Sequence, residues 1–444
     1  MMEKDLIMNK IKVGLYLTNK GIKDVDLSNP EKGNPGIGGT QFNFITLPYY
    51  YNKYYNNVDF TFYAHDVKYL PNGINKVKAN SATDAVIKAK KDKCDLFIYR
   101  PTQDKEGEDF LKNVKHIGIN TIAWAHNTPF KHLRKISTNE RIIRYVNVSK
   151  EQYDMLRDHS VIYKSEMIYN GFDGRIYEPG DNINKGLTVT FLGSLIPGKG
   201  FHVLARNWKN ILKIVPEARL NVIGSGRLYS RDSALGKLGI ADEKYEDLFR
   251  PFITDSNNRV LDSVRFYGVL GREKIPIMQR SLVGCVNPTG ETENCPGSAI
   301  EFQACGTPVV SGAYWGLLDT VENGHTGLLG KSDQDLVDNI VYLLRNKNKA
   351  IEMGRNGIGF IKQRFNHDII SNKWHDLFTD CIENPNNKSV ILPIDQNPEY
   401  EYKKFSDKMR VLKEKIFLFK AIPPYIAIRR YHRILKRLLR LLQM

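Results

Sequence analysis

The 444-residue sequence contains no uninterrupted apolar run long enough to cross a bilayer, and residues 1–12 lack the long apolar core of a signal peptide. Its five cysteines show no paired metal-ligand spacing, and an odd number argues against a disulfide framework. These absences argue against a secreted disulfide scaffold and against a membrane-spanning protein. We therefore expect a soluble or peripheral protein of the reducing cytosol.

Two nucleotide-binding motifs are incomplete. The loop 36–40 lacks the third glycine of the dinucleotide fingerprint, because Gln41 stands at that position, and a NAD enzyme is therefore disfavoured. Residues 193–199 satisfy the first seven positions of a P-loop, but Gly200 replaces the Ser or Thr that holds Mg²⁺. A glycine turn with one lysine at a helix start still attracts phosphate. No Asp-x-Asp motif is found in a suitable loop, and no metal or other cofactor is expected.

Strand and helix candidates alternate along the chain, which predicts an α/β protein with parallel, doubly wound sheets. With 41% apolar residues, the length allows two domains. The segment 169–180 breaks both periodicities and is rich in turn-formers, so we place the domain boundary there. Residues 227–263 have no clear period. The expected strands are 13–17, 60–63, 94–99, 121–125, 145–149, 187–192, 220–223, 264–267, 282–286 and 308–310, and the expected helices include 42–55, 81–91, 201–214, 273–280 and 298–304.

Two carboxylates, Glu293 and Glu301, flank a glycine that opens a helix. Backbone N–H groups at Gly297 and Ser298 then lie at a helix N-terminus, where unpaired donors and the macrodipole attract a diphosphate. The carboxylates can accept hydrogen bonds from sugar and ribose hydroxyls. A solvated pair of carboxylates is the alternative. His126 follows a strand and is expected to face the crevice in which open α/β sheets bind ligands, although a lone histidine can also be structural.

The order of these motifs resembles the retaining glycosyltransferases of family 4. Besides the Glu-x7-Glu pair, the matching motifs are the glycine-lysine turn 193–200, the Gly-Gly-Thr loop at 38–40, and the segments 304–310 and 321–329. The similarity runs from about residue 12 to about residue 375. It implies the GT-B fold, in which two Rossmann-like domains face a cleft, and it implies transfer without a bound metal.

The resemblance also implies roles for individual residues. It assigns Glu293 to the hydroxyls of the donor sugar, Glu301 to the nucleotide ribose, Lys199 to the donor diphosphate and His126 to the transferred sugar. The family usually has an arginine where this chain has Ser194, so one cation is missing; Arg272 and Arg227 are candidates to replace it. The expected catalytic residues are His126, Lys199 and Glu293, and the expected donor-binding residues are Gly38, Gly39, Ser194, Lys199, Glu293, Gly297, Ser298 and Glu301.

The C-terminal segment is strongly basic, since residues 401–444 contain 13 Lys and Arg against 3 Asp and Glu. Apolar residues recur at helical spacing from Tyr425 to Leu442, which predicts a basic amphipathic helix lying on anionic lipid. A helix packed on the protein's own core or on a second subunit is the alternative. The residues expected to bind the membrane are Arg429, Arg430, Arg433, Lys436, Arg437 and Arg440.

The expected organisation is therefore an acceptor-binding domain (1–180), a nucleotide-sugar-binding domain (181–366), a helix that crosses back to the first domain (367–384) and a linker with a membrane-associating tail (385–444). The expected function is retaining transfer of a sugar from a nucleotide sugar to a glycan or lipid-linked acceptor, at the cytoplasmic face of a membrane and without nucleic acid. Two alternatives are a P-loop-like NTPase that uses Gly193 to Lys199, and a non-catalytic glycan-binding protein of the same fold. The sequence does not indicate the donor sugar, the base, the acceptor or the oligomeric state.

Overall fold

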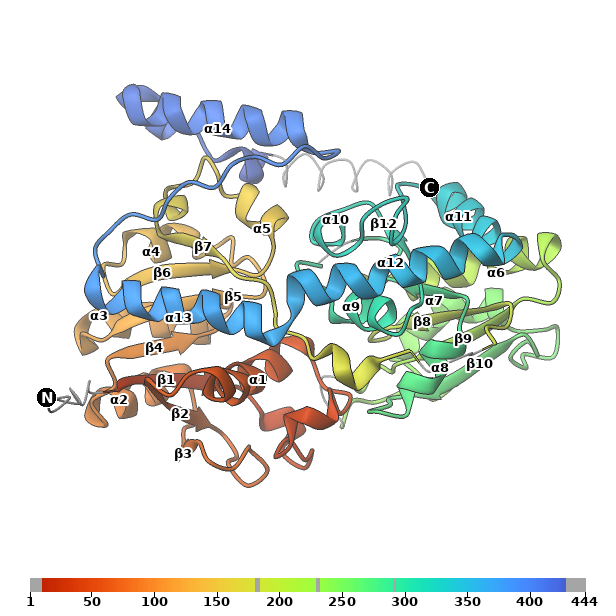
Figure 1. Cartoon of the computed structure of the whole chain (residues 1–444), viewed down its shortest axis with the longest axis horizontal. Coiled ribbons are helices and arrows are strands. Elements are labelled where there is room, and N and C mark those ends of the chain that lie inside the picture. The colour runs from red at the N-terminus through yellow and green to blue at the C-terminus, as the bar shows by residue number, and fades with distance from the viewer. Residues whose placement is uncertain (1–9, 180–183, 229–231, 291–292, 429–444) are drawn as a thin grey trace, which may run out of the picture.

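The computed structural model describes residues 10–179, 184–228, 232–290 and 293–428, and its two α/β halves lie side by side (Figure 1). Each half contains one sheet in which all paired strands are parallel. Helices cover the sheets, and buried aliphatic and aromatic side chains fill the space between the layers. The predicted GT-B architecture of two doubly wound sheets is confirmed.

The first half has a seven-stranded sheet in the order β3-β2-β1-β4-β5-β6-β7. Its strands are β1 (Ile11–Leu17), β2 (Val58–Ala64), β3 (Asn75–Lys78), β4 (Leu96–Tyr99), β5 (Asn120–Ala125), β6 (Ile142–Asn147) and β7 (Ser165–Met167). Its helices are α1 (Gly39–Tyr54), α2 (Ala82–Lys91), α3 (Lys105–Ile117), α4 (Leu133–Thr138) and α5 (Lys150–Asp154). The central strands are buried on both faces, as expected of a parallel sheet with helices on both sides.

The second half has a six-stranded sheet in the order β10-β9-β8-β11-β12-β13. Its strands are β8 (Thr188–Leu192), β9 (Arg219–Ile223), β10 (Val264–Gly268), β11 (Val283–Val286), β12 (Val309–Gly312) and β13 (Gly327–Gly330). Its helices are α6 (Phe201–Ile214), α7 (Glu243–Ile253), α8 (Lys274–Arg280), α9 (Gly297–Ala304), α10 (Leu317–Thr320), α11 (Asp333–Arg345) and α12 (Lys347–Phe365).

The segment 227–263, which shows no clear hydrophobic period in the sequence, contains helix α7. The Asp242 side chain caps this helix by accepting a hydrogen bond from the N–H of Tyr245. Tyr245, Phe249 and Ile253 recur four residues apart and are buried in the core of the second half. A helix interrupted by a proline near its end and surrounded by charged loops gives only a short periodic signal, which explains why the sequence analysis did not assign it.

Helix α13 (His367–Glu383) directly follows α12 but packs on α1 of the first half, so the chain returns across the molecule (Figure 1). Trp374 of α13 meets Trp124 of β5 edge to face, with ring centroids 5.0 Å apart. His375 stacks on Tyr55 with centroids 4.1 Å apart. These aromatic contacts hold α13 against the first half, although it directly follows α12 of the second half.

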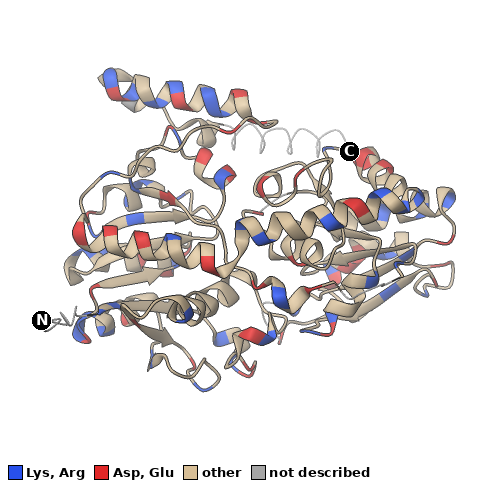
Figure 2. Ribbon diagram, viewed as in Figure 1, with Lys and Arg blue, Asp and Glu red and all other residues tan. Residues whose placement is uncertain are grey.

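The segment after α13 runs along the first half and ends in helix α14 (Tyr400–Lys415). Arg157 donates to the carbonyl oxygen of Leu392 at 2.8 Å, and the Leu392 N–H donates to the Tyr153 hydroxyl at 3.1 Å. Acidic and basic residues are interspersed along α14 (Figure 2). The lysines that face the protein bind carboxylates: Lys413 lies 2.9 Å from Asp158.

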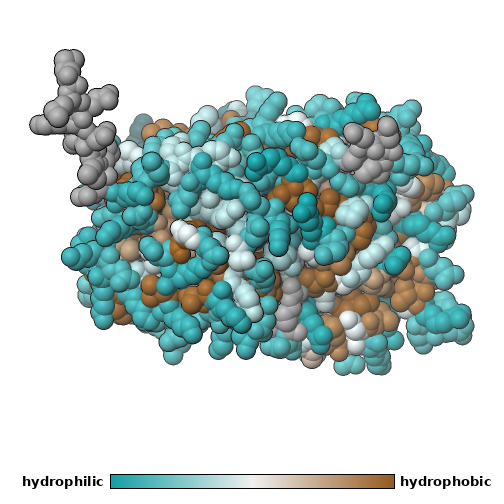
Figure 3. Space-filling model, turned by 60° about the horizontal axis from the view of Figure 1, so that its bottom comes forward, coloured by the Kyte–Doolittle hydropathy of each residue, from teal (hydrophilic) through white to brown (hydrophobic). Residues whose placement is uncertain are grey.

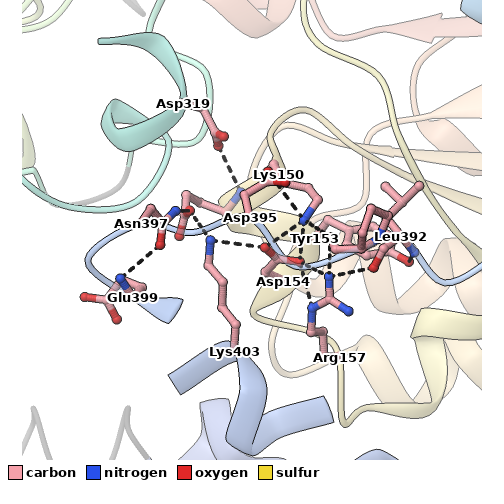
Figure 4. Close-up of polar contacts among 12 residues, drawn as sticks. Lys150, Tyr153, Asp154, Arg157, Asp319, Leu392, Asp395, Asn397, Glu399 and Lys403 are labelled. Atoms are coloured by element: carbon pink, nitrogen blue, oxygen red, sulfur yellow. Dashed lines mark hydrogen bonds and ion pairs between the residues drawn. The ribbon is translucent and has the colours of Figure 1, made fainter. Parts of the chain in front are cut away.

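Lys403 of α14 is the centre of a buried cluster of charges (Figure 4). Its Nζ forms ion pairs with Glu151 and, at 3.1 Å, with Asp154, and all three side chains are at most 6% exposed. Asp154 also pairs with Lys150 and Arg157. Asp319 of α10 accepts a hydrogen bond from the Glu151 N–H at 2.9 Å, which brings the second half into the same cluster. Burial and the nearby Glu151 raise the pKa of Asp319 to about 7.

Candidate active site

A cavity of about 560 Å³ lies between the two halves. It is bounded by the carboxyl ends of strands from both sheets: Arg100 follows β4, His126 follows β5, Gly193 follows β8 and Asn287 follows β11. The loop 36–39 at the start of α1 forms another part of the wall. Parallel sheets bind ligands at this edge, because the loops that leave the strands converge there.

Lys199 and Glu293 meet in the second half of this cavity. The Lys199 Nζ lies 2.6 Å from Oε1 of Glu293, and Asn287 donates to the same oxygen at 2.9 Å. Lys199 belongs to a 3₁₀ turn, Pro197–Lys199, that follows β8, and Gly200 after it has a φ of +72° before α6 begins. A Cβ at Gly200 would lie 2.8 Å from Thr289, so both the turn and the close packing require glycine. The arrangement places one ammonium group next to a carboxylate at a helix start.

Ser194, which occupies the place of the missing arginine, lies on the cavity wall. It is 1% exposed, and its hydroxyl donates to the carbonyl oxygen of Ser225 at 3.3 Å. Arg272 and Arg227, the two candidates for the replacement, are not among the residues that line the cavity, and Arg227 donates to the carbonyl oxygen of Ser233. The cations that line it in the part of the chain that the structure describes are Arg100, Lys199 and Lys274.

Glu301 is held by two groups that the sequence analysis did not identify. Lys274, the first residue of α8, lies 2.7 Å from Oε1 of Glu301, and the Tyr177 hydroxyl donates to the same oxygen at 2.9 Å. Burial and the adjacent carboxylate raise the pKa of Tyr177, so its hydroxyl stays protonated and remains a donor. Glu301 is thus oriented as an anion on the wall of the cavity. The ion pair between positions 274 and 301 leaves no short motif in the sequence, because it depends on the contact of two separate helices.

Two helices begin at the cavity. Gly297 and Ser298 form the first turn of α9, whose N-cap is Pro296, and Gly38 and Gly39 begin α1. The first N–H groups of a helix have no partner within the helix and carry a partial positive charge. The prediction that Gly297 and Ser298 lie at a helix start agrees with the structure. Gly38 and Gly39 were expected in a loop before a helix at 42–55, and α1 instead begins at Gly39, so both helix starts face the same space.

His126 is 7% exposed and lines the cavity, with its ring 4.6 Å from the Trp124 ring and 5.7 Å from the Phe44 ring between centroids. Neither ring nitrogen makes a hydrogen bond with the described residues. Burial, reinforced by the positive charge of Arg100, lowers the pKa of His126 to about 3. The imidazole is therefore neutral at physiological pH and can both donate and accept a hydrogen bond.

Two asparagines, Asn294 and Asn170, also belong to the site, and they were not predicted as site residues from the sequence. Asn294 donates to the backbone oxygen of His126 at 2.8 Å, and this bond crosses from the second half to the first. Asn170 is buried on the cavity wall, and its Oδ1 has no partner among the described residues. Asparagines are common in ordinary turns, so neither position carries a functional signal in the sequence alone.

Other expected features are not placed by the structure. The residues expected to bind the membrane, Arg429, Arg430, Arg433, Lys436, Arg437 and Arg440, lie outside the described residues. Among the described residues, no helix is long and apolar enough to span a membrane, and no group of three His, Cys, Asp or Glu side chains has the arrangement of a metal site. On the face shown in Figure 3, hydrophobic side chains are interspersed with hydrophilic ones.

The fold and the position of the cavity define the class of the protein: a GT-B architecture with its site between two doubly wound halves. Residues 175–360 match the model of the family "Glycosyl transferases group 1". The greater part of the second half is therefore similar to the group 1 glycosyltransferases, in agreement with the resemblance found in the sequence.

Individual proteins support this assignment. The chain is 27% identical over 231 residues to an uncharacterized glycosyltransferase of Methanocaldococcus jannaschii, covering 51% of this chain and 56% of that protein. It is 27% identical to the D-inositol 3-phosphate glycosyltransferase of Corynebacterium aurimucosum, covering 58% and 62% of the two chains. The chain thus spans roughly three fifths of these relatives. The crystal structure of Anabaena HepE in complex with UDP superimposes with a TM-score of 0.61 and 16% identity, covering 83% of this chain and all of that one, which shows a common fold.

Proposed function

We propose that the protein is a retaining glycosyltransferase that moves a sugar from a nucleotide sugar to a glycan or lipid-linked acceptor in the synthesis of a cell-surface polysaccharide or glycoconjugate. The observation that carries this proposal is the wall of the cavity in the second half. There, Lys199, Glu293 and the first turn of α9 stand side by side around one space. A cation and helix N–H groups suit a diphosphate, and an adjacent carboxylate suits sugar hydroxyls.

The geometry supports a separate role for each group. The start of α9 and Lys199 would bind the diphosphate and stabilise the negative charge that develops on it as the bond to the sugar breaks. Glu293 would accept hydrogen bonds from the donor sugar, and Glu301, oriented by Lys274 and Tyr177, would accept them from the ribose. His126, neutral and with no hydrogen bond from its ring to the described residues, would orient the transferred sugar from the first half. No step in this scheme requires a metal.

The matching proteins support the donor class. HepE was crystallised with UDP, which makes a uridine diphosphate sugar our first choice of donor. We also propose the domain division described above, with residues 1–180 holding the acceptor, residues 181–366 holding the donor, residues 367–384 joining the two and residues 385–444 forming the tail. The packing of α13 on α1 supports the third part of this division.

The test of the function is a screen of UDP-, GDP- and ADP-sugars for an increase in the melting temperature of the full chain. A ligand that binds only the native state stabilises it by about 2.7 kcal/mol at one hundred times its Kd. We expect one nucleotide to stabilise the protein in the presence of a chelator and the same nucleotide sugar to be consumed when acceptor glycans are added. If no nucleotide sugar raises the melting temperature, the proposal is wrong; binding without any turnover would instead indicate a glycan-binding protein of this fold.

We further propose that the tail holds the enzyme at an anionic membrane surface. The lysines of α14 that face the first half are bound to carboxylates, so the lipid contact must come from the outward side and from the residues that follow. Leu418 is 82% exposed and Ile428 46% exposed at the end of the described chain, next to the arginine-rich segment. Deletion of residues 425–444 is expected to release the protein from vesicles that contain phosphatidylserine, while activity on a soluble acceptor remains. Sedimentation with vesicles measures this, and unchanged binding would contradict the membrane proposal.

A further inference from the structure

Charges on the cavity wall are balanced in the second half but not in the first. Of the three cations, Lys199 pairs with Glu293 and Lys274 pairs with Glu301. Arg100 makes no ion pair within 4.0 Å in the part of the chain that the structure describes. The third carboxylate on the wall, Asp173, is bound by Arg175 and by the Tyr50 hydroxyl. Arg100 is therefore a half-buried cation whose charge no neighbouring cavity carboxylate neutralises.

The carboxylates nearest to Arg100 along the chain accept other hydrogen bonds. Asp104 caps helix α3 by accepting from the Gly107 N–H at 3.0 Å and from the Thr102 hydroxyl at 2.6 Å. The bonds from Thr102 and from the Gly107 N–H, together with the charge of Arg100, hold the pKa of Asp104 below its usual range. Glu106 accepts from the N–H of Ala82 at 2.9 Å. No hydrogen bond joins the Arg100 side chain to the described residues, so its guanidinium donors are available to a ligand in the cavity.

Near Arg100, the cavity wall carries further polar atoms that form no hydrogen bond with the described residues. It follows β4, the direct neighbour of β5 in the sheet, and β5 ends at His126. The two ring nitrogens of His126 and Oδ1 of Asn170 are buried, line the cavity and have no partners among the described residues. These neutral groups suit sugar hydroxyls, whereas Arg100 suits an oxyanion, which a guanidinium can bind with two parallel hydrogen bonds.

The donor diphosphate can be bound in the second half by Lys199 and the start of α9. Arg100, in the first half, is therefore not needed for the diphosphate. We propose that Arg100 binds an oxyanion, a phosphate or a carboxylate, that the acceptor sugar carries, so that the enzyme selects an anionic acceptor. This inference rests on the proposed function for the identity of the acceptor side, but it concerns binding in the first half alone. Removal of water when the cleft fills would strengthen the attraction.

The test measures equilibrium binding of hexoses, of the same hexoses as 6-phosphates and of the matching uronates to the full chain, at constant ionic strength. We expect at least one anionic series to bind tenfold or more tightly than its neutral counterpart, because hydrogen bonds to a charged group are the stronger kind. Comparison of the phosphate and uronate series shows which oxyanion is preferred. Arg100→Gln should remove the preference and leave nucleotide-sugar binding unchanged.

Two control variants separate the possible outcomes. Arg134→Gln removes an exposed arginine of the first half and should keep the preference, and Lys199→Ala should weaken nucleotide binding but keep the preference for anionic sugars. A preference that requires Arg100 in a protein that consumes no nucleotide sugar would support this inference and contradict the proposed function. Equal binding of neutral and anionic sugars, or a preference that survives Arg100→Gln, would overturn the inference even if transfer is observed.

Discussion

Lys199→Ala is expected to lower kcat/KM for sugar transfer by about 10²- to 10³-fold, the range found when one preorganised donor to a developing anion is removed. The Lys199 ammonium lies 2.6 Å from Glu293 on the cavity wall, and the usual second cation is absent because Ser194 stands in its place. The loss should therefore appear mainly in kcat, since the charge on the leaving diphosphate is greatest in the transition state. Initial rates at varied donor concentration measure the effect.

The matched control is Lys213→Ala, which removes an exposed lysine from α6, the helix that begins directly after the turn containing Lys199. It should keep wild-type kinetics. A melting temperature of Lys199→Ala close to that of the wild type would show that the lost rate is not lost folding. Wild-type kcat/KM in Lys199→Ala would exclude Lys199 from diphosphate binding.

Lys403→Met is expected to destabilise the C-terminal segment by on the order of 3–5 kcal/mol, the cost of leaving a buried charge without its partner. Lys403 is 1% exposed, and its removal leaves the carboxylate of Glu151 without a cation, while Asp154 keeps Lys150 and Arg157 (Figure 4). Methionine fills a similar volume, so the effect isolates the charge. Hydrogen exchange of α14 measures the loss of local stability in that helix, and thermal unfolding of the full chain measures the loss of overall stability.

Lys408→Met is the control, because Lys408 is an exposed lysine of the same helix. It should leave both measurements unchanged. The double change Lys403→Met with Glu151→Gln should recover part of the stability, since the uncompensated charge is then gone. Equal destabilisation by the single and double variants would show that packing, and not charge, holds α14 in place.

Local pattern was sufficient to predict most of the fold. The apolar strands of the two sheet centres and the amphipathic helix α6 were located closely, because their periodicity repeats over several residues. Strand β3 (Asn75–Lys78) was missed because three of its four residues are polar and it lies at the sheet edge. Strand β7 spans three residues, too few to show an alternation.

For the candidate site too, some residues were predicted from local sequence motifs and others were not. Lys199, Glu293 and Glu301 stand in contiguous motifs whose spacing can be recognised, and all three line the cavity. Lys274, Tyr177 and Asn294 were not recognised, since each acts through a partner more than 25 residues away in the sequence. Arg227 and Arg272 were candidates for the cation missing at Ser194 only because they are basic. In the structure, neither lines the cavity.

The sequence by itself determined the two parallel sheets, the glycine turns and the acidic pair of the second half, because these depend on backbone conformation and on neighbours a few residues apart. Only the tertiary structure decided which cations face the cavity, which of them are neutralised, and that the lysines of α14 bind the first half. Charge is felt through space and changes with burial, so the same lysine or arginine is a surface group, a structural ion pair or a ligand site according to what the fold places within a few ångströms of it.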